Sequence, residues 1–137
     1  MVSAFYRKLI ADVGAGLEHL WFQDCVGVST GRLIAKSPGR WFKSPAEVVP
    51  FYESLNKMFA SLKPTRALWS DTEIFEEGAL DRNYSAAAAE RVFEQLSVEG
   101  PYVGGAVSFA WQYLSPYMGK TGAAKLYDRY LQAAHGG

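Results

Sequence analysis

The chain has 137 residues, of which 49% are hydrophobic and 20% charged, so it suits one folded domain and is too hydrophobic for a disordered segment. Its 14 basic and 14 acidic residues cancel, and neither sign forms a long block, which argues against a nucleic-acid partner or an anionic membrane surface. The single cysteine, Cys25, excludes an intramolecular disulfide and a cysteine-based metal cage.

No targeting or membrane segment is visible in the sequence. Arg7, Lys8 and Asp12 interrupt the apolar residues near the N-terminus, so a secretory signal is not apparent. Nowhere do about 18 apolar residues run together, so no membrane span is expected. Because a signal that has already been removed would leave the same picture, the localisation stays open.

The first third of the chain predicts one helix, one strand and a long connection. Apolar residues at helical spacing predict a helix over residues 2–17, and residues 18–23 predict a short strand. Gln23, Asp24 and Cys25 lie at the end of that strand. Residues 26–44 then form a connection that is cationic and aromatic, and connections of this length are usually functional or disordered. A plain solvated loop is an equally good interpretation, since Lys and Arg are mostly exposed.

The rest of the chain alternates helices and strands. Ser44, Pro45 and Glu47 predict the start of a helix that runs to about residue 62. A strand over residues 65–70 and an acidic loop follow. Ser85 predicts the cap of a helix over residues 86–98. Residues 102–111 predict a strand buried on both faces, because they are almost continuously apolar. A loop over residues 112–120 and a helix over residues 121–134 complete the chain.

Some predicted helix positions are also expected to face the core, because they repeat at helical spacing. For the two middle helices and the last one these are Val48, Tyr52, Leu55, Phe59, Leu62, Val92, Phe93, Leu96, Ala123, Leu126, Tyr127, Tyr130 and Leu131.

The predicted order is α-β-α-β-α-β-α, which indicates an α/β domain with about three parallel strands alternating with four helices. Three strands make a small parallel sheet whose two edges are both open. Open edges favour pairing with another chain, so we expect a homo-oligomer.

The segment over residues 66–77, RALWSDTEIFEE, is the best candidate for a functional centre. It begins like a buried strand and then becomes acidic at Asp71, Glu73, Glu76 and Glu77. In many α/β enzymes, strands that end in carboxylates and aromatic residues deliver polar chemistry to one end of a sheet. The segment therefore predicts a site, although it does not by itself prove an enzyme.

Three strand-end motifs resemble one known family. They are LWFQDCVGV, LWSDTEIFEE and YVGGAVSFAWQYLSP. Together they resemble the C-terminal part of a glycoside-hydrolase-like TIM-barrel family of unknown function, in which strands end in QDG-V-G, in Trp followed by E-x-F-E, and in Ser, Phe and Trp before Pro. The matching positions are Gln23, Asp24, Val26, Gly27, Trp69, Glu73, Phe75, Glu76, Ser108, Phe109, Trp111 and Pro116, whereas Cys25 replaces a glycine-like position.

The resemblance implies the last three βα units of a (β/α)8 barrel. A full barrel takes about 250 residues, so the chain is expected to be a partial barrel, either as a fragment, as an oligomer or in an adapted small fold. In retaining glycosidases of this type the second-to-last strand carries the nucleophilic glutamate, which implies that role for Glu73. The last strand carries a sugar-stacking tryptophan, which implies that role for Trp111. The acid/base of such enzymes comes from an earlier strand, which this chain lacks.

The positions of the acidic residues predict a catalytic pair. Glycosidic hydrolysis needs two carboxyl groups, about 5–5.5 Å apart for retention or about 6.5–9.5 Å for inversion. Asp24 and Glu73, at the ends of adjacent predicted strands, are the first candidates, with Asp71 and Glu76 in reserve. Each has a plainer interpretation: Glu73 as a solvated or helix-capping carboxylate, and Asp24 as a turn residue before Gly27.

The remaining candidates would bind substrate rather than react with it. Tryptophans would stack on sugar rings, and polar side chains would bind hydroxyl groups, although core packing explains a tryptophan such as Trp111 slightly better. These substrate-binding candidates are Trp21, Gln23, Trp69, Asp71, Glu76, Trp111 and Gln112.

Other chemistries have weak support. Cys25 lacks a nearby histidine as base, and the two histidines have no metal-binding spacing, so neither a metal nor another cofactor is expected. No G-x-S-x-G motif supports an esterase. The sequence therefore predicts a glycoside-hydrolase-like protein that acts on carbohydrate. The alternative is a non-catalytic partial barrel that binds carbohydrate or self-associates.

Overall fold

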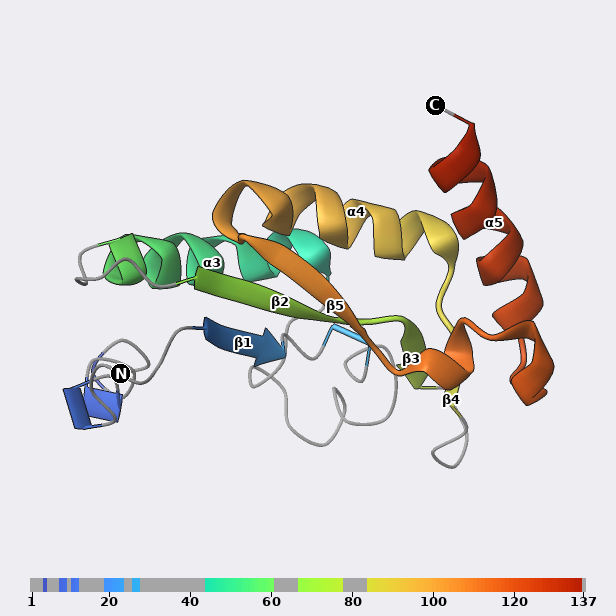
Figure 1. The fold of residues 1–137 in the computed structure, drawn as a ribbon, viewed down its shortest axis with the longest axis horizontal. Helices are drawn as coiled ribbons and strands as arrows, with labels where there is room; N and C mark the ends of the chain where they lie inside the picture. The colour runs from blue at the N-terminus through green and yellow to red at the C-terminus, as the bar shows by residue number, and fades with distance from the viewer. Residues whose placement is uncertain are drawn as a thin grey trace.

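The computed structural model describes Ala4 and residues 8–9, 11–12, 19–23, 26–27, 44–60, 67–77 and 84–136. Within them, a parallel three-stranded sheet forms the centre of the molecule (Figure 1). Its strands are β1 (His19–Gln23), β2 (Ala67–Glu73) and β5 (Gly105–Phe109), in the order β1-β2-β5. The predicted α/β class and the three parallel strands are confirmed.

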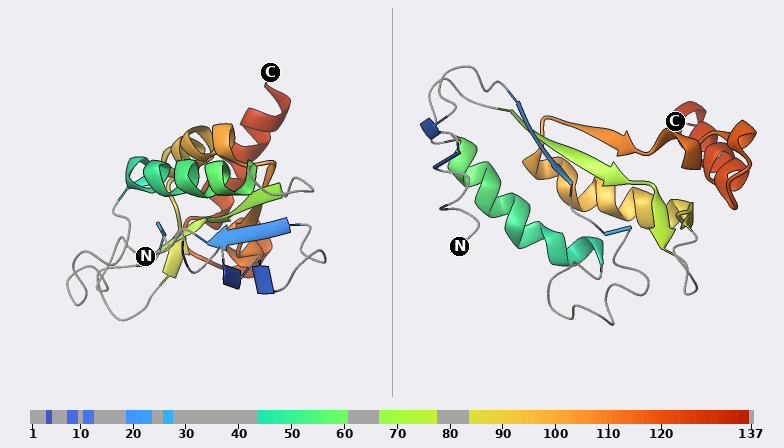
Figure 2. Two further views of the ribbon diagram at one scale, coloured as in Figure 1. Left: turned by 90° about the vertical axis from the view of Figure 1, so that its left-hand side faces the viewer. Right: turned by 90° about the horizontal axis from the view of Figure 1, so that it is seen from below.

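Two helices cover one face of this sheet. They are α3 (Pro45–Ala60), which connects β1 to β2, and α4 (Ala89–Glu99), which lies between β2 and β5 in the chain. Figures 1 and 2 show both on the same side of the strands, where they also pack against each other. Helices on one face only are typical of the outer wall of a (β/α)8 barrel, whereas a doubly wound sheet has helices on both faces.

The main hydrophobic core lies between α3 and β2. It contains Val48, Tyr52, Leu55, Met58, Phe59 and Leu68. The predicted inward face of this helix is thus confirmed at its four described positions. The helix begins as expected after Ser44, whose carbonyl oxygen accepts a 3.1 Å hydrogen bond from the N–H of Glu47.

The acidic segment is not the predicted loop. The central strand continues to Glu73, and after Ile74 the chain forms β3 (Phe75–Glu77), which pairs in antiparallel fashion with β4 (Tyr84–Ala86). The prediction that Ser85 caps a helix is also wrong, because Ser85 lies in β4 and α4 begins only at Ala89. Residues of the alanine run are kept extended by tertiary hydrogen bonds: Ala86 N–H donates to Thr121 O (2.8 Å) and Ala87 N–H to Ile74 O (3.0 Å).

The C-terminal part differs from the prediction in where it packs. After β5 come two short 3-10 helices, η4 (Trp111–Tyr113) and η5 (Pro116–Met118), and then α5 (Ala123–His135). The last helix contacts β4, η4 and η5 at the end of the sheet, as Figure 1 shows. The third strand is therefore not buried on both faces, and Ala106 and Ser108 are exposed.

The same arrangement explains the exposed helix positions that were expected to face inward. Leu96 of α4 borders the uncovered side of β5 and is exposed, and Tyr130 of α5 is exposed as well. By contrast, Ala123 and Leu126 are buried as predicted. Leu126 belongs to a second hydrophobic cluster, with Ile74, Phe75, Ala87, Ala89, Val92 and Tyr113.

Other predictions fall partly or wholly outside the described residues. All described residues between positions 4 and 12 are helical, and Lys8 pairs with Asp12 at 2.9 Å, but the rest of the predicted first helix is outside. The long connection is described only at Val26, Gly27 and Ser44. None of the described helices has the length and apolarity needed to cross a membrane.

Candidate functional site

Alternate residues of β2 face opposite sides of the sheet. Leu68 packs in the core against α3, and Ser70 bonds to Glu99 of α4, so the even-numbered residues face the helices. Trp69, Asp71 and Glu73 therefore lie on the opposite side, which we call the far face. The register adds residues of both neighbouring strands to the far face: His19, Trp21, Gln23, Gly105 and Val107.

Glu73 is the last residue of β2 and has no exposed surface. Its carboxylate oxygen Oε1 accepts a 2.7 Å hydrogen bond from the amide Nε2 of Gln23, the last residue of β1. The side chains of two adjacent parallel strands therefore meet at the carboxyl end of the sheet. The structure thus brings together two residues that the sequence placed at neighbouring strand ends.

Gly27 approaches the same carboxylate from the segment that follows β1. A Cβ atom at this position would lie 2.2 Å from the carbonyl oxygen of Phe75 and 2.9 Å from Oε2 of Glu73. No real side chain tolerates these distances, so the backbone fits against Glu73 only because residue 27 is glycine.

Arg91, in the first turn of α4, contacts the backbone beside Glu73. Its Nη2 donates to the carbonyl oxygens of Glu73 (2.6 Å) and Phe75 (3.0 Å). Its Nε pairs with Oε1 of Glu76 at 3.1 Å, and Nη1 donates to Oε1 of Gln95. The Glu76 carboxylate, a candidate for substrate binding, is thus engaged by Arg91.

Aromatic rings occupy the far face nearer the start of β2, where Trp69 lies four residues before Glu73. Trp21 and Trp69 lie with their ring centroids 6.3 Å apart and tilted by 30°, and His19 meets the edge of Trp69 at 5.8 Å. The Trp69 ring in turn packs on Gly105, where a Cβ atom would come within 3.0 Å of it. Trp21 is 60% exposed and so presents a ring to solvent.

The other predicted site residues are more scattered. Asp71 is half-buried on the far face, two residues before Glu73 on the same strand. Trp111 and Gln112 lie in η4 beyond the end of β5, and Trp111 is 63% exposed. Asp24 and Cys25 lie outside the described residues, so the proposed partnership of Asp24 and Glu73 stays a prediction.

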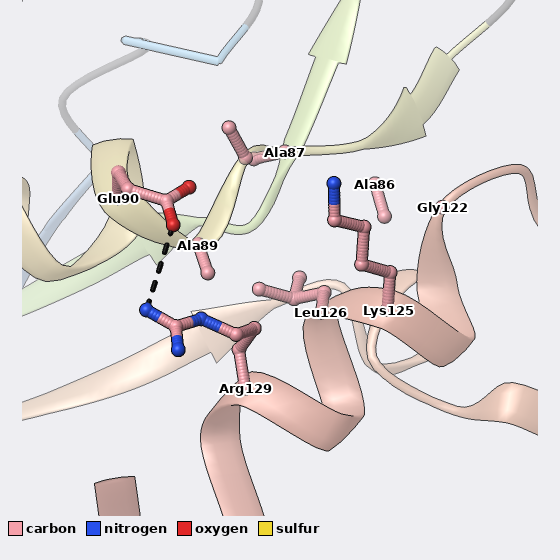
Figure 3. A pocket seen from close by; sticks show the side chains of 9 residues that line it. Ala86, Ala87, Ala89, Glu90, Gly122, Lys125, Leu126 and Arg129 are labelled. Carbon is pink, nitrogen blue, oxygen red and sulfur yellow. Dashed lines mark ion pairs between the residues drawn. The ribbon is translucent and has the colours of Figure 1, made fainter. Parts of the chain in front are cut away.

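Two cavities lie apart from these residues. One, of about 280 Å³, lies between the start of α4 and α5, where Lys125 and Arg129 line it (Figure 3). In it the Arg129 guanidinium pairs with Glu90 at 3.6 Å. The other, of about 250 Å³, lies between α4 and β5 and is lined by Ser70 and Glu99. Neither contains a predicted site residue.

A buried polar cluster lies on the helix side of the same strand. Ser70 donates to Oε2 of Glu99 and lies 3.0 Å from the hydroxyl of Thr72, and all three residues are buried.

No candidate metal site is found in the described part of the chain. Within it, no three His, Cys, Asp or Glu residues gather as metal ligands would.

A comparison with known families identifies the relatives of the chain. Residues 1–123 match the family described as Domain of unknown function (DUF4434). The chain belongs to this family. The family description assigns no activity to DUF4434 members, and no curated protein matches the sequence.

A solved structure has a similar fold. It is the crystal structure of a protein from Bacteroides thetaiotaomicron described as a "putative alpha-L-fucosidase", with a TM-score of 0.69 and 19% sequence identity. The similarity covers 93% of this DUF4434 chain and 34% of the other chain, so this chain spans about a third of that protein. At this identity the likeness establishes the fold, which corresponds to part of a larger glycosidase-like structure.

Sequence reasoning missed the contribution of Arg91. One signal could have found it: a cation in the first turn of a helix is disfavoured by the helix dipole, so a residue there needs specific partners. The buried Ser70–Glu99 pair was also missed, because Glu99 lies 29 residues further along the chain.

Proposed function

We propose that this DUF4434 chain forms the part of a glycosidase-like active site that carries the nucleophile, Glu73. One observation carries the proposal. A fully buried carboxylate lies at the carboxyl end of the central parallel strand, on the face away from the helices, and a neighbouring strand orients it through Gln23. In barrels of this kind, reacting groups are placed at that end of the strands.

The hydrogen bond from Gln23 suits a nucleophile. An amide N–H that donates to a carboxyl oxygen stabilises the ionised form, and the ionised form is the one that attacks carbon. In the proposed step, a Glu73 oxygen bonds to the anomeric carbon while the bond to the leaving-group oxygen breaks. A general acid protonates that oxygen, and water later hydrolyses the glycosyl ester and regenerates the carboxylate.

Access to Glu73 requires a movement. Since the side chain has no exposed surface, a sugar reaches it only when a neighbour turns away. Gln23 is exposed and contacts Glu73 from β1, so rotation of its side chain is the movement that we propose for access.

Two carboxylates are candidates for the acid/base. Asp24 would follow Gln23 directly, as the sequence predicts. Asp71 lies on the far face two residues before Glu73, and a strand rises about 3.3 Å per residue, so their Cα atoms are about 6.6 Å apart. Both side chains project from the same face, so their carboxyl groups can approach the separation of about 5–5.5 Å that a retaining mechanism requires. The resemblance in sequence adds a third source, an earlier strand of the barrel.

The aromatic residues would bind the sugar. The exposed ring of Trp21, beside Trp69, offers a stacking surface on the same far face, and Trp111 would provide another beyond β5. Asp71 and Gln112 would contact hydroxyl groups, whereas the Glu76 carboxylate is paired with Arg91. The similar structure is described as a "putative alpha-L-fucosidase", so an α-L-fucoside is the first substrate to test.

An activated substrate tests the nucleophile separately from the acid. The 4-nitrophenolate group leaves without protonation, so the first step on 4-nitrophenyl glycosides, which forms the glycosyl ester, requires the nucleophile but not the general acid. We expect the wild-type chain to release nitrophenol and Glu73→Gln to lose about 10³-fold or more of that activity. Glu94→Gln is the matched control, because Glu94 is exposed on α4 away from the site.

A covalent label checks the same assignment directly. The nucleophile displaces fluoride ion from the anomeric carbon of a 2-deoxy-2-fluoro glycosyl fluoride and forms a slowly hydrolysed ester, which peptide mass spectrometry should find on Glu73. Activity in folded Glu73→Gln equal to that of wild type, or a label on another carboxylate, would contradict the proposal.

A second candidate is a non-catalytic module that binds carbohydrate or self-associates. Two features favour it: Trp21 and Trp111 are largely exposed, and among the described strands β1 and β5 each pair with β2 alone. Unpaired edges invite association with a second copy. Light scattering after size exclusion should then give a mass above the monomer, whereas a monomer at high concentration would contradict self-association. Glycan binding that survives Glu73→Gln, without turnover by wild type, would favour this candidate over the enzyme.

A further inference from the structure

We infer that Arg91 is a positioning residue for Glu73: it fixes the backbone from which the carboxylate projects. The inference deepens the proposed function and rests on it for its catalytic meaning. The contacts of Arg91 with Glu73 and Phe75 are to their carbonyl oxygens.

The contacts of Arg91 account for the turn that follows β2. Glu73 O and Phe75 O both accept from Nη2, at 2.6 and 3.0 Å. The carbonyl between them, Ile74 O, accepts from the N–H of Ala87 at 3.0 Å. Three consecutive carbonyl groups are thus held, two by Arg91 and one by the start of the segment that leads into α4. This fixes the point at which β2 ends and β3 begins.

The guanidinium group suits this task. It is planar, always charged and carries five N–H donors in fixed directions, so it can bind two carbonyl oxygens and a carboxylate at once. A lysine would offer one flexible ammonium group in its place. The Arg91 side chain is only 11% exposed, so solvent competes weakly with these contacts.

The location of Arg91 also indicates a specific role. A cation in the first turn of α4 faces the positive end of the helix dipole, which is unfavourable. The carboxylate of Glu76, the side-chain oxygen of Gln95 and the two carbonyl groups compensate for this. These four acceptors all belong to α4 or to the end of β2 and its continuation, so Arg91 joins the helix to the strand end that carries Glu73.

Glu73 is therefore fixed from two sides. Gln23 holds the carboxylate from β1, and Arg91 holds the main chain from α4. A shift of about 1 Å in a reacting group can lower a rate by about 100-fold. Loss of the Arg91 contacts to the main chain should therefore displace the Glu73 carboxylate and lower the reaction rate.

The test compares four variants by kinetics on the activated glycoside. We expect Arg91→Ala to lower kcat by about 100-fold with KM changed by less than about threefold, because orientation is lost but not the sugar-binding surface. Arg91→Lys should lie between wild type and alanine. Glu76→Gln should lower kcat less than Arg91→Ala does, because the carbonyl contacts remain. Arg129→Ala is the control, since Arg129 lies in the cavity between α4 and α5.

Two further measurements separate positioning from general stability. Added guanidinium ion should restore part of the kcat of Arg91→Ala, and should not affect Glu73→Gln. With ¹³C-labelled glutamate, the carboxyl resonance of Glu73, assigned by its loss in Glu73→Gln, should move in Arg91→Ala and stay in place in Arg129→Ala. If Arg91→Ala fails to fold, Arg91→Lys supplies the same comparison.

The outcomes distinguish the positioning role of Arg91 from the proposed glycosidase function. A folded Arg91 variant with unchanged kcat and an unmoved Glu73 resonance overturns the positioning role. A wild-type chain without glycosidase activity overturns the proposed function, and the Glu73 resonance then still decides whether Arg91 orients that carboxylate.

Discussion

The two faces of strand β2 differ in composition although they are built from alternate residues of one segment. Toward the helices, Leu68 joins the main hydrophobic core and Ser70 bonds to Glu99. On the far face, Trp69 and Asp71 are half-buried, and Glu73 at the carboxyl end of the strand is fully buried.

This difference separates packing from function. Apolar contact with α3 explains the choice of residues on the helix side, since burial of apolar surface is the main stabilising term in folding. Both faces contain a buried carboxylate, Glu99 on the helix side and Glu73 on the far face, but only Glu73 lies at the carboxyl end of the central strand, where Gln23 of the neighbouring strand holds it. Burying an ionisable group carries a cost, so its presence at a strand end favours a functional role.

The largest difference between the faces should appear in core truncation. Phe59→Ala removes a side chain that is 1% exposed in the main core, so we expect a loss of about 3–5 kcal/mol in the free energy of unfolding. Urea denaturation measures it. A loss below about 1 kcal/mol would mean that the helix face is not the stabilising side of the sheet.

The polar cluster on the helix side should rank next. Ser70→Ala removes a donor from the buried Glu99 carboxylate, and bonds to charged groups contribute about 1.5–3 kcal/mol. Ser54→Ala, at an exposed position of α3, should change the stability by less than about 0.5 kcal/mol in the same denaturation experiment. Equal losses of stability in the two serine variants would mean that the Ser70–Glu99 hydrogen bond does not stabilise the fold.

Gly27→Ala tests the crowded side of Glu73. The added methyl group would overlap the carbonyl oxygen of Phe75, so we expect a loss of about 1–3 kcal/mol and a shift of the Glu73 carboxyl resonance. At Gly100 a Cβ atom would meet nothing within 4 Å, and φ is −48°, so Gly100→Ala should not destabilise the protein. The comparison fails if both variants retain wild-type stability.

The smallest effect on stability is expected at the exposed tryptophan of the far face. Trp21→Ala should change the free energy of unfolding by less than about 1 kcal/mol, because the ring is 60% exposed. In the proposed function it should nevertheless weaken sugar binding by about tenfold, which is about 1.4 kcal/mol. A fluorescence titration measures binding, with Tyr117→Ala as the control, since Tyr117 is 93% exposed on η5. A large loss of stability in Trp21→Ala with unchanged sugar binding would mean that Trp21 serves packing and not binding.

Most of the sheet and the first long helix could be predicted because their signals are local. Ser44, Pro45 and Glu47 mark the start of α3, and its apolar spacing marks the buried face. The apolar runs ending at Gln23 and Ser70 indicated strands, and their alternation with helices indicated parallel pairing.

The hairpin of β3 and β4 could not be predicted in the same way. Phe75 favours a strand, but Glu76 and Glu77 do not, and the alanine run after Ser85 favours a helix. Hydrogen bonds from Ala86 to Thr121 and from Ala87 to Ile74 override that preference. Such partners are distant in the chain, so a local pattern does not reveal them.

The candidate site was predictable in place but not in its contacts. The position of Glu73 at a strand end follows from the run of apolar residues before it. The bond from Gln23 and the contacts of Arg91 depend on register and on main-chain oxygens, which side-chain patterns do not display.

The packing of α5 indicates that this helix belongs to the same cooperative folding unit as the β3–β4 hairpin. The family match stops at residue 123, the first residue of this helix. Yet Leu126 is buried beside Ile74 and Phe75, and Thr121 accepts the hydrogen bond that keeps Ala86 extended. Local unfolding involves contiguous groups of such contacts. Hydrogen exchange in α5 and in the β3–β4 hairpin should therefore be coupled, and trimming the chain at the family boundary would loosen the residues next to Glu73.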